Sequence, residues 1–244
     1  MNRIELHHVS KKFLLSGGRK LLRGHIRDLI RREPSEAFYA LRDVSFTVRE
    51  GESLAVVGSN GAGKSTLLNV ITRLCPVDEG AVTIQGRLSA LLELGSGFHI
   101  DLTGIENLRL NASLLGLSRR RTAELFDQII DFSGIGEFIT QPLRTYSAGM
   151  ILRLGFSIAI HLDPDILVVD EVFGVGDQAF QEKCIERMLA FRKAGKTMVC
   201  VSHSLGTLRN MCDRALWLDH GQVILEGSPD EVFAAYQGRP VASA

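Results

Sequence analysis

The chain has 244 residues and as many basic as acidic side chains, 28 of each, so its formal net charge is zero. This length suits one well-buried domain, or a domain with a subdomain, and the neutral balance argues against a nucleic-acid partner. The four cysteines form no C-x-x-C pair, which indicates reduced thiols in a cytosolic protein and excludes a zinc site or a disulfide framework.

No stretch of the sequence approaches the ~20 apolar residues that a membrane span needs. The first five residues, Met1-Asn2-Arg3-Ile4-Glu5, carry charge where a signal peptide would need an apolar core. Any membrane role therefore has to come through a partner.

The first fifty residues predict two strands with a basic helix between them. Apolar and polar residues alternate over Ile4 to Val9 and over Val44 to Val48, as in half-buried strands. From Arg19 to Glu33 apolar residues recur at helical spacing, and Arg and Lys fill most other positions. We place this basic amphipathic helix, as an insertion, at residues 18–34, where Pro34 closes it.

Three further strands end in polar or charged residues. The apolar run Leu54 to Val57 is typical of a strand buried on both faces, and a glycine-rich turn and a helix from about Lys64 follow it. Ile166 to Val169 ends in two acids, Met198 to Val201 ends in Ser202-His203, and helical patterns fill much of Ile105 to Ile160. Alternating strands and helices predict an α/β fold with a mainly parallel sheet, whose ligands lie at the carboxyl ends of its strands.

The last forty residues predict a hairpin and a helix. Ala215 to Leu218 and Gln222 to Leu225 flank a turn at 219–221. Ser228 as N-cap, Pro229 at the first helical position and Glu231 two residues later predict the start of a final helix.

The glycine-rich turn matches the phosphate-binding pattern G-x-x-x-x-G-K-[ST] at every fixed position. Glycines let backbone N–H groups wrap phosphates, and the helix amino terminus adds positive potential. Lys64 would reach the outer phosphates and the Ser65 hydroxyl would bind Mg2+. An accidental glycine-rich turn is the alternative, but the position between a buried strand and a helix argues against it. The residues expected to contact the nucleotide here are Gly58, Ser59, Asn60, Gly61, Ala62, Gly63, Lys64, Ser65 and Thr66.

The polar residues at the other two strand ends suit the chemistry of a triphosphate. Asp170 would hold Mg2+ through water, and Glu171 would act as general base on the attacking water. His203 would contact the γ-phosphate and that water, since a donor there supports charge on the transferred phosphoryl group. Taken singly, a strand running into a charged loop and a solvated histidine are the alternatives.

A second candidate anion site precedes a helix that we expect to begin near Ile151. Small residues at a helix start can cradle an anion, and Ser147, Ala148 and Gly149 provide them. Taken alone, the pattern is equally typical of a serine that only caps the helix and binds no anion.

In their order along nearly the whole chain, these motifs resemble those of ATP-binding-cassette (ABC) ATPases. The resemblance implies a single domain over residues 1–244 with a P-loop NTPase core, an antiparallel β subdomain and an α-helical subdomain at about 93–160. It also implies a head-to-tail homodimer, in which Ser147 and Gly149 of one subunit close on the γ-phosphate held by the other. Asp177 resembles the aspartate of the loop that links the two active sites.

At three places the sequence departs from the ABC family pattern or leaves more than one candidate residue for a role. Phe13 resembles the aromatic residue that stacks on adenine, but Phe38 and Tyr39 are rivals and each could be part of the core. The usual signature is Leu-Ser-Gly-Gly-Gln, whereas this chain has Tyr146, Ala148 and Met150 at the first, third and fifth positions. The usual glutamine that contacts magnesium and the membrane partner is absent, and Glu93 is the nearest substitute.

Three segments look like the cassettes of polysaccharide exporters, which move lipid-linked O-antigen, capsular polysaccharide or teichoic acid: 91–107, 146–156 and 170–184. This narrower resemblance implies ATP and Mg2+ as cofactors, a transmembrane permease subunit, and a lipid-linked polysaccharide that passes through the permease. It places the chain at the cytoplasmic face of the bacterial inner membrane.

The basic helix at 18–34 is similar to an insertion of O-antigen cassettes that lies near the membrane. It would face anionic lipid headgroups or the pyrophosphate linker of the glycan carrier, and a solvated edge helix is the alternative. Some members carry a carbohydrate-binding domain after the cassette, and we expect none here.

Three other functions compete with polysaccharide export. The first is a cassette ATPase for another cargo, such as a drug, a lipid or an ion. The second is a soluble cassette protein of translation or DNA repair, but these usually have two cassettes or a long coiled-coil insert. The third is a GTPase, whose Asn-Lys-x-Asp motif does not occur in the sequence.

Overall fold

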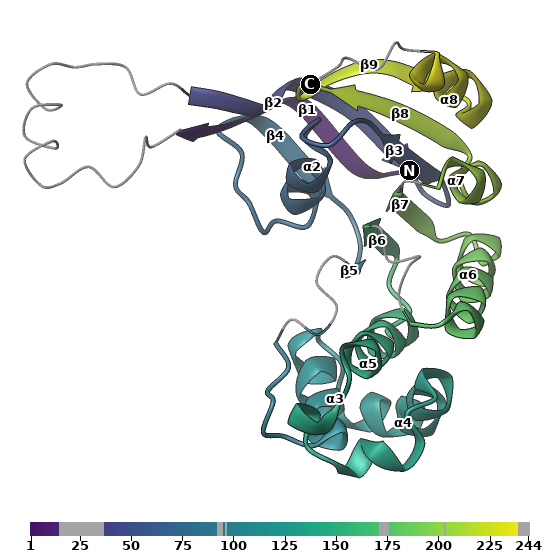
Figure 1. Ribbon diagram of the computed structural model, residues 1–244. Helices are drawn as coiled ribbons and strands as arrows, with labels where there is room; N and C mark the ends of the chain where they lie inside the picture. Colours follow the sequence, from purple (N-terminus) through teal and green to yellow (C-terminus); the bar gives the residue numbers. More distant parts are fainter. Residues whose placement is uncertain (15–36, 92–94, 96, 171–175, 203, 239–244) are drawn as a thin grey trace, which may run out of the picture.

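The computed structural model describes residues 1–14, 37–91, 95, 97–170, 176–202 and 204–238 (Figure 1). The predicted basic helix at 18–34 lies outside these residues. So do Glu93, Glu171 and His203.

A six-stranded sheet forms the centre of the molecule. Its strands follow the order β5 (Leu88–Leu91), β6 (Ile166–Asp170), β7 (Thr197–Val201), β3 (Ser53–Val57), β8 (Arg214–Asp219) and β9 (Gln222–Gly227). All neighbours pair in parallel except β8 and β9, which form the predicted hairpin. Every residue of β3 and β7 is buried, which explains their nearly continuous apolar sequences. The prediction of a mainly parallel sheet is confirmed.

A smaller antiparallel sheet packs beside the central one, in the order β2 (Ala37–Arg49), β1 (Asn2–Leu14) and β4 (Glu79–Ile84). Its apolar face shares one core with β3 and with helix α2 (Lys64–Ile71), so the two sheets enclose that helix. The predicted strands in β1 and β2 were correct but too short, and β4 and β5 were missed.

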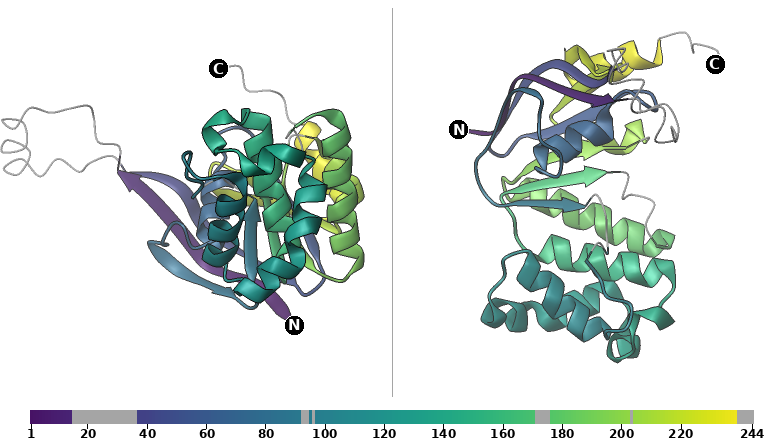
Figure 2. Two further views of the ribbon diagram at one scale, coloured as in Figure 1. Left: turned by 90° about the horizontal axis from the view of Figure 1, so that it is seen from below. Right: turned by 90° about the vertical axis from the view of Figure 1, so that its left-hand side faces the viewer.

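The helices divide into two groups (Figures 1 and 2). Helices α3 (Gly104–Leu114), α4 (Arg119–Ser133) and α5 (Ala148–His161), with the 3-10 turns η1 (Gly136–Thr140) and η2 (Leu143–Thr145), share a core of their own. Helices α6 (Gln178–Lys193), α7 (Leu205–Met211) and α8 (Pro229–Gln237) pack with α5 in a further core on the central sheet. An α-helical and an antiparallel β part beside the parallel sheet agree with the predicted fold class.

The helix starts follow from local sequence. Thr103 with Glu106 and Ser228 with Glu231 form capping boxes at α3 and α8, the second as predicted. Helix α5 begins three residues before the predicted Ile151, because Ser147 is its N-cap and accepts from the Met150 N–H. In the part of the chain that the structure describes, no helix is long and apolar enough to cross a membrane.

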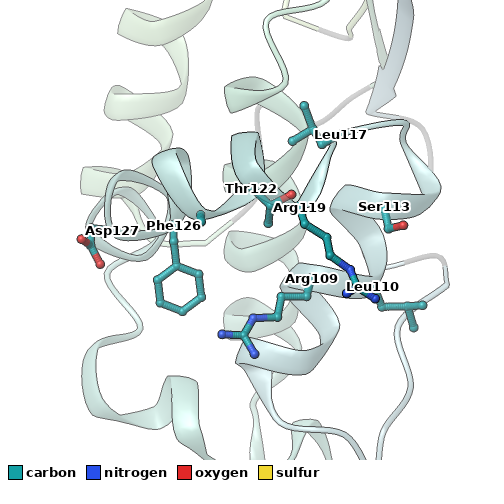
Figure 3. Close-up of a pocket in the computed structure, with 9 residues that line it drawn as sticks. Arg109, Leu110, Ser113, Leu117, Arg119, Thr122, Phe126 and Asp127 are labelled. Carbon is teal, nitrogen blue, oxygen red and sulfur yellow. The ribbon is translucent and has the colours of Figure 1, made fainter.

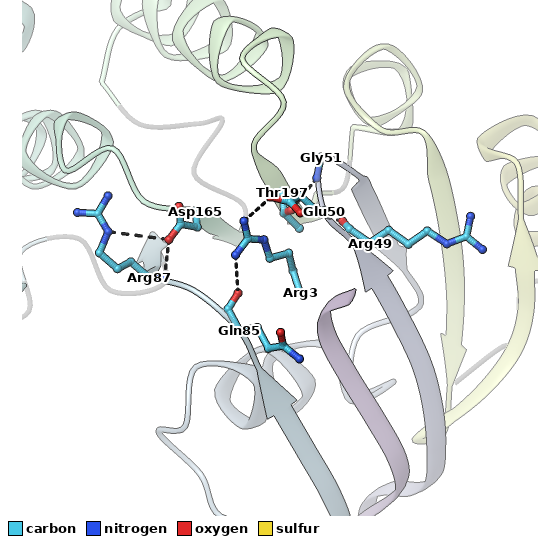
Figure 4. A network of polar contacts seen from close by, with 8 residues as sticks. All are labelled: Arg3, Arg49, Glu50, Gly51, Gln85, Arg87, Asp165 and Thr197. Carbon is cyan, nitrogen blue, oxygen red and sulfur yellow. Dashed lines mark hydrogen bonds and ion pairs between the residues drawn. The ribbon is translucent and has the colours of Figure 1, made fainter. Parts of the chain in front are cut away.

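A polar network ties together the amino ends of the central strands (Figure 4). The Asp165 carboxylate accepts from the Arg87 backbone N–H at 2.8 Å, and the Thr197 hydroxyl accepts from the Gly51 N–H at 3.0 Å. Arg3 pairs with Glu50 and donates to the Gln85 carbonyl. These contacts hold the amino ends of the strands, whereas a ligand is expected at the carboxyl ends. Their role is therefore structural.

Candidate nucleotide-binding site

Three strand ends bring the candidate phosphate and magnesium groups to one edge of the central sheet. Val201 of β7 lies opposite both Val56 of β3 and Asp170 of β6 in the parallel register. With strands spaced about 4.8 Å apart, the Asp170 backbone is about 10 Å from β3. The glycine-rich loop leaves β3 at this edge, and Asp170 is half-buried there.

The loop can take its path because two of its glycines touch backbone from other strands. A Cβ on Gly58 would lie 2.2 Å from the Leu218 carbonyl oxygen of β8. A Cβ on Gly63, which has φ +106, would lie 2.4 Å from the Ala40 carbonyl oxygen of β2. The loop is therefore held between β8 and β2, and side chains at these two positions are excluded.

Lys64 places its ammonium inside this loop. The residue is buried, and Nζ donates to the carbonyl oxygens of Gly58 at 2.8 Å and Ser59 at 3.0 Å. Ser65 next to it is exposed and Thr66 is half-buried, both on the first turn of α2. Phosphate oxygens enclosed by the loop would offer the ammonium charged acceptors, which bind it more strongly than neutral carbonyls.

The second candidate anion site lies at the amino end of α5. Ser147 and Ala148 are exposed and Gly149 is half-buried, and no acidic residue occupies the first turn. Ser147 is thus an N-cap, as the alternative interpretation had it, on an open helix end. Figure 1 shows α5 in a different part of the molecule from α2, so one chain does not bring the two candidate sites together.

Asp177 lies at the start of α6 and uses both of its carboxylate oxygens. Oδ1 accepts from the Phe180 backbone N–H at 3.0 Å, and Oδ2 is 2.7 Å from Nη2 of Arg153 on α5. These two contacts hold the pKa of Asp177 below its usual value. Asp177 therefore joins α6 to α5, the helix that carries Ser147, a link that the sequence did not predict.

Comparison with known proteins agrees with this geometry. Residues 41–174 match the family described as ABC transporter. The chain is 42% identical to the O-antigen export system ATP-binding protein RfbB of Klebsiella pneumoniae, over 96% of this chain and 97% of that protein. The chain belongs to the ABC transporter family. It is 43% identical to the teichoic acids export ATP-binding protein TagH of Bacillus anthracis, over 96% of the chain but only 42% of that longer protein.

Solved structures show the same fold for this cassette. An ATP-binding subunit of an ABC transporter superposes with a TM-score of 0.76 at 24% identity, over 98% of this chain and 95% of that chain. A dimeric post-hydrolysis state of the cassette MJ0796, bound to ADP and Pi, gives 0.74 at 22% identity, over 93% and 98%. The predicted fold class is confirmed.

The aromatic candidates of the cassette differ in their surroundings. Phe13 of β1 lies opposite Phe38 of β2, and they are 45% and 46% exposed, so neither belongs to the core. The Tyr39 ring already has the Lys12 ammonium 4.9 Å and the Arg42 guanidinium 4.7 Å from its centre. The Phe13 ring also has a cation near it, the Lys11 ammonium at 5.5 Å, so it is their greater exposure that makes Phe13 and Phe38 more open than Tyr39 to a new stacking partner.

The oxygen donors at the strand edge fit Mg2+. This ion is usually bound by one or two protein oxygens together with phosphates and water, and Ser65 and Asp170 offer a hydroxyl and a carboxylate. Among the described residues there is no cluster of three or more His, Cys, Asp and Glu side chains of the kind that would hold a metal ion alone.

Tyr146 explains the first departure from the usual signature. Its ring is buried, and its hydroxyl donates to the Phe138 carbonyl of η1 at 2.6 Å. Burial raises the pKa of Tyr146 to about 12. A Cβ on Gly104 would lie 2.3 Å from the hydroxyl oxygen, so that glycine makes room for the ring. Tyr146 thus anchors the loop before Ser147, a contact that the sequence alone did not reveal.

Proposed function

We propose that the chain is the ATP-binding and hydrolysing subunit of an ABC transporter that exports a lipid-linked cell-surface polysaccharide across the bacterial inner membrane. The observation that carries this is the phosphate loop closed around Lys64, at the same sheet edge as Asp170. The similarity to RfbB and TagH supports the cargo class. The cassette would lie at the cytoplasmic face, attached through the permease.

Each residue at the sheet edge has a role in this proposal. Lys64 would exchange the loop carbonyls for the β- and γ-phosphates, and the loop N–H groups would hold the remaining oxygens. Ser65 and Asp170 would hold Mg2+, directly and through water, with Glu93 as a further contact. Bound magnesium neutralises charge that develops on the phosphates. Glu171 would take the proton of the attacking water, and His203 would orient the water and the γ-phosphate.

A second copy of the chain would complete each site. The exposed helix end at Ser147, Ala148 and Gly149 would close on the γ-phosphate bound by the partner, with Asp177 at the same interface. Intact ATP would contact both the phosphate loop of one chain and the α5 helix end of the other, whereas ADP and phosphate would not bridge them. The nucleotide therefore favours the closed dimer only before hydrolysis. Phe13 would stack on the adenine, with Phe38 next to it.

A groove between α3 and α4 suits the permease (Figure 3). Its volume is about 780 Å3, and Leu110, Leu117 and Phe126 line it together with the charged residues Arg109, Arg119 and Asp127. The Arg109 guanidinium lies 5.9 Å from the centre of the Phe126 ring, and neither arginine forms an ion pair with another described residue. The groove is lined by apolar side chains, two arginines and one aspartate, so its charge is positive on balance and it fits a cytoplasmic segment of the permease that carries apolar residues and an acidic one.

The proposed cargo can be tested with Glu171→Gln in cells. Without the general base, hydrolysis should fall by about 10²–10⁴-fold while ATP still binds. Lipid-linked glycan should then accumulate inside the cell, and surface polysaccharide should disappear. Glu182→Gln on the exposed face of α6 is the matched control and should leave export intact. Normal surface polysaccharide in the Glu171→Gln cells would refute polysaccharide export and favour another cargo.

The groove is tested by reversing its charge. Arg109→Glu with Arg119→Glu should repel an acidic segment, so that the permease no longer co-purifies with the cassette from membranes. Arg187→Glu on the exposed face of α6 makes the same kind of change outside the groove and should retain the permease. Undiminished co-purification of the double variant would exclude the groove as the permease contact.

A further inference from the structure

The turn between α3 and α4 carries exposed leucines and exposed arginines next to one another. Leu114 and Leu115 at the end of α3 are 67% and 47% exposed. Three consecutive arginines, at 119–121, make up the first turn of α4, and all three are exposed. We call residues 113–121 the α3–α4 corner.

The charges of α4 are arranged against its helix dipole. A helix favours acidic side chains at its amino end and basic ones at its carboxyl end. Helix α4, which the structure describes in full, has its arginines at the amino end, no acid in the first turn and no basic residue in the last turn. Its acids, Glu124, Asp127 and Asp131, all come later. The stability of α4 therefore does not explain the arginines, whose charge points to an anionic partner.

The ion pairs of these arginines do not neutralise them. Arg120 Nε is 3.1 Å from one carboxylate oxygen of Glu124, and Arg121 Nη1 is 3.0 Å from the other. One carboxylate thus serves two guanidinium groups, whose side chains stay 90% and 52% exposed. In both pairs the arginine precedes the glutamate, which is the less favourable order on a helix. The corner therefore keeps a net positive charge that faces solvent.

The tip of the corner is open. Gly116 has φ +87, and a Cβ there would meet nothing within 4 Å. The leucines before this glycine and the arginines after it present apolar surface and positive charge over one short stretch of chain. This combination is typical of segments that lie on a membrane, where basic side chains meet phosphates and apolar ones enter the headgroup region.

The corner adjoins the groove that we assign to the permease. Leu117 and Arg119 of the corner also line that groove (Figure 3). A cassette held by the permease at the groove would therefore carry the corner on the side that faces the membrane. Only this step rests on the proposed function.

We infer that the α3–α4 corner binds anionic phospholipid headgroups at the membrane surface, with Arg120 and Arg121 on the phosphates and Leu114 and Leu115 among the headgroups. A protein partner would hold a guanidinium in a shaped site, whereas a lipid surface requires only charge and exposure. Arg120, 90% exposed, suits the second case. The cassette would then touch the membrane directly, in addition to its contact with the permease.

Vesicle binding tests this with the full chain, in the absence of permease and nucleotide. The vesicles contain phosphatidylcholine with increasing phosphatidylglycerol, and bound protein is measured by sedimentation. Each arginine near such a surface strengthens binding about fivefold, so Arg120→Gln with Arg121→Gln should weaken it about 25-fold. The melting temperature of this double variant should not fall, because the lost charges oppose the helix dipole.

The matched control removes two exposed basic charges from another helix. Lys183→Gln with Arg187→Gln on α6 should stay within about twofold of wild type, because those charges would lie away from the lipid. The basic residues of 18–34 also attract anionic vesicles. They are kept in every variant, so that only differences between variants are compared.

Leu114→Trp reports whether the corner itself touches lipid. Its fluorescence should shift to the blue when phosphatidylglycerol vesicles are added, whereas that of Leu74→Trp should not. Leu74 is also 67% exposed, but it follows α2 in another part of the molecule. The buried Trp217 gives the same background in both variants.

Two results would overturn the inference. They are undiminished vesicle binding by the double arginine variant, and equal shifts of Leu114→Trp and Leu74→Trp. If wild type ignores the vesicles but the double arginine variant loses the permease from membranes, the corner binds protein and the lipid assignment is wrong. The vesicle assay needs neither ATP nor permease, so a failure of the export function in Glu171→Gln cells would leave its results unchanged.

Discussion

Lys64→Met is expected to lower ATP hydrolysis by a factor on the order of 10²–10³, as loss of a preorganised charge at a phosphoryl group does. Methionine keeps most of the buried length of the side chain but cannot donate a hydrogen bond. The carbonyls of Gly58 and Ser59, now 2.8 and 3.0 Å from Nζ, lose a donor, and phosphates bound in the loop would lose the positive charge of Lys64. Nucleotide binding by calorimetry and hydrolysis by phosphate release would measure both effects.

Lys196→Met is the matched control for this loss of charge. Lys196 also forms an ion pair, 3.0 Å from Asp163, but it lies at the amino end of β7, far along the strand from the phosphate edge. This variant should hydrolyse ATP at the wild-type rate. Hydrolysis by Lys64→Met within a few-fold of wild type would contradict the role of the loop.

The sequence predicted the phosphate edge because its signals are local. A buried apolar run followed by fixed glycines specifies both the strand and the turn, and parallel pairing then brings Gly58, Asp170 and Ser202 to one edge. The boundaries of the antiparallel sheet were harder to predict. Positive φ values at His8 and Asp43 mark irregular pairing in β1 and β2, and the apolar alternation breaks there while the strands continue.

Two strands escaped prediction for different physical reasons. β4 is an edge strand with exposed or half-exposed residues throughout, so burial imposes no clear pattern on it. β5 has only four residues, too few for a period to be recognised. Helix α5 was placed too late because Gly149 has a low helix propensity, whereas the Ser147 cap starts the helix before it.

The remaining features that the sequence did not predict depend on contacts between residues far apart in the chain. The ion pair from Arg153 to Asp177 and the hydrogen bond from Tyr146 to Phe138 depend on how α5 packs on its neighbours. Neither residue type is unusual at its position, so no local pattern marks it. The exposure of Phe13 and Phe38 likewise follows from the pairing of β1 with β2 and not from their own sequence.

Gly58→Ala should cause a large structural defect, because the added methyl group meets the backbone of a central strand. The new Cβ would lie 2.2 Å from the Leu218 carbonyl oxygen and 3.0 Å from the Ala62 Cβ. The carbonyl belongs to β8, which is paired in parallel with β3, so it cannot move without disturbing the central sheet. We expect a loss of about 3 kcal/mol in the free energy of unfolding, and a melting temperature lower by about 6–12 °C.

Gly61→Ala separates close contact from backbone strain in the same loop. Gly61 has φ +79, but a Cβ there would meet nothing within 4 Å, so only the left-handed conformation opposes alanine, at about 1 kcal/mol. Thermal unfolding and ATP binding of both variants should therefore rank Gly58→Ala as the more damaging on each measure. If Gly61→Ala were the worse of the two, backbone conformation and not the approach of β8 would be what holds the phosphate loop in shape.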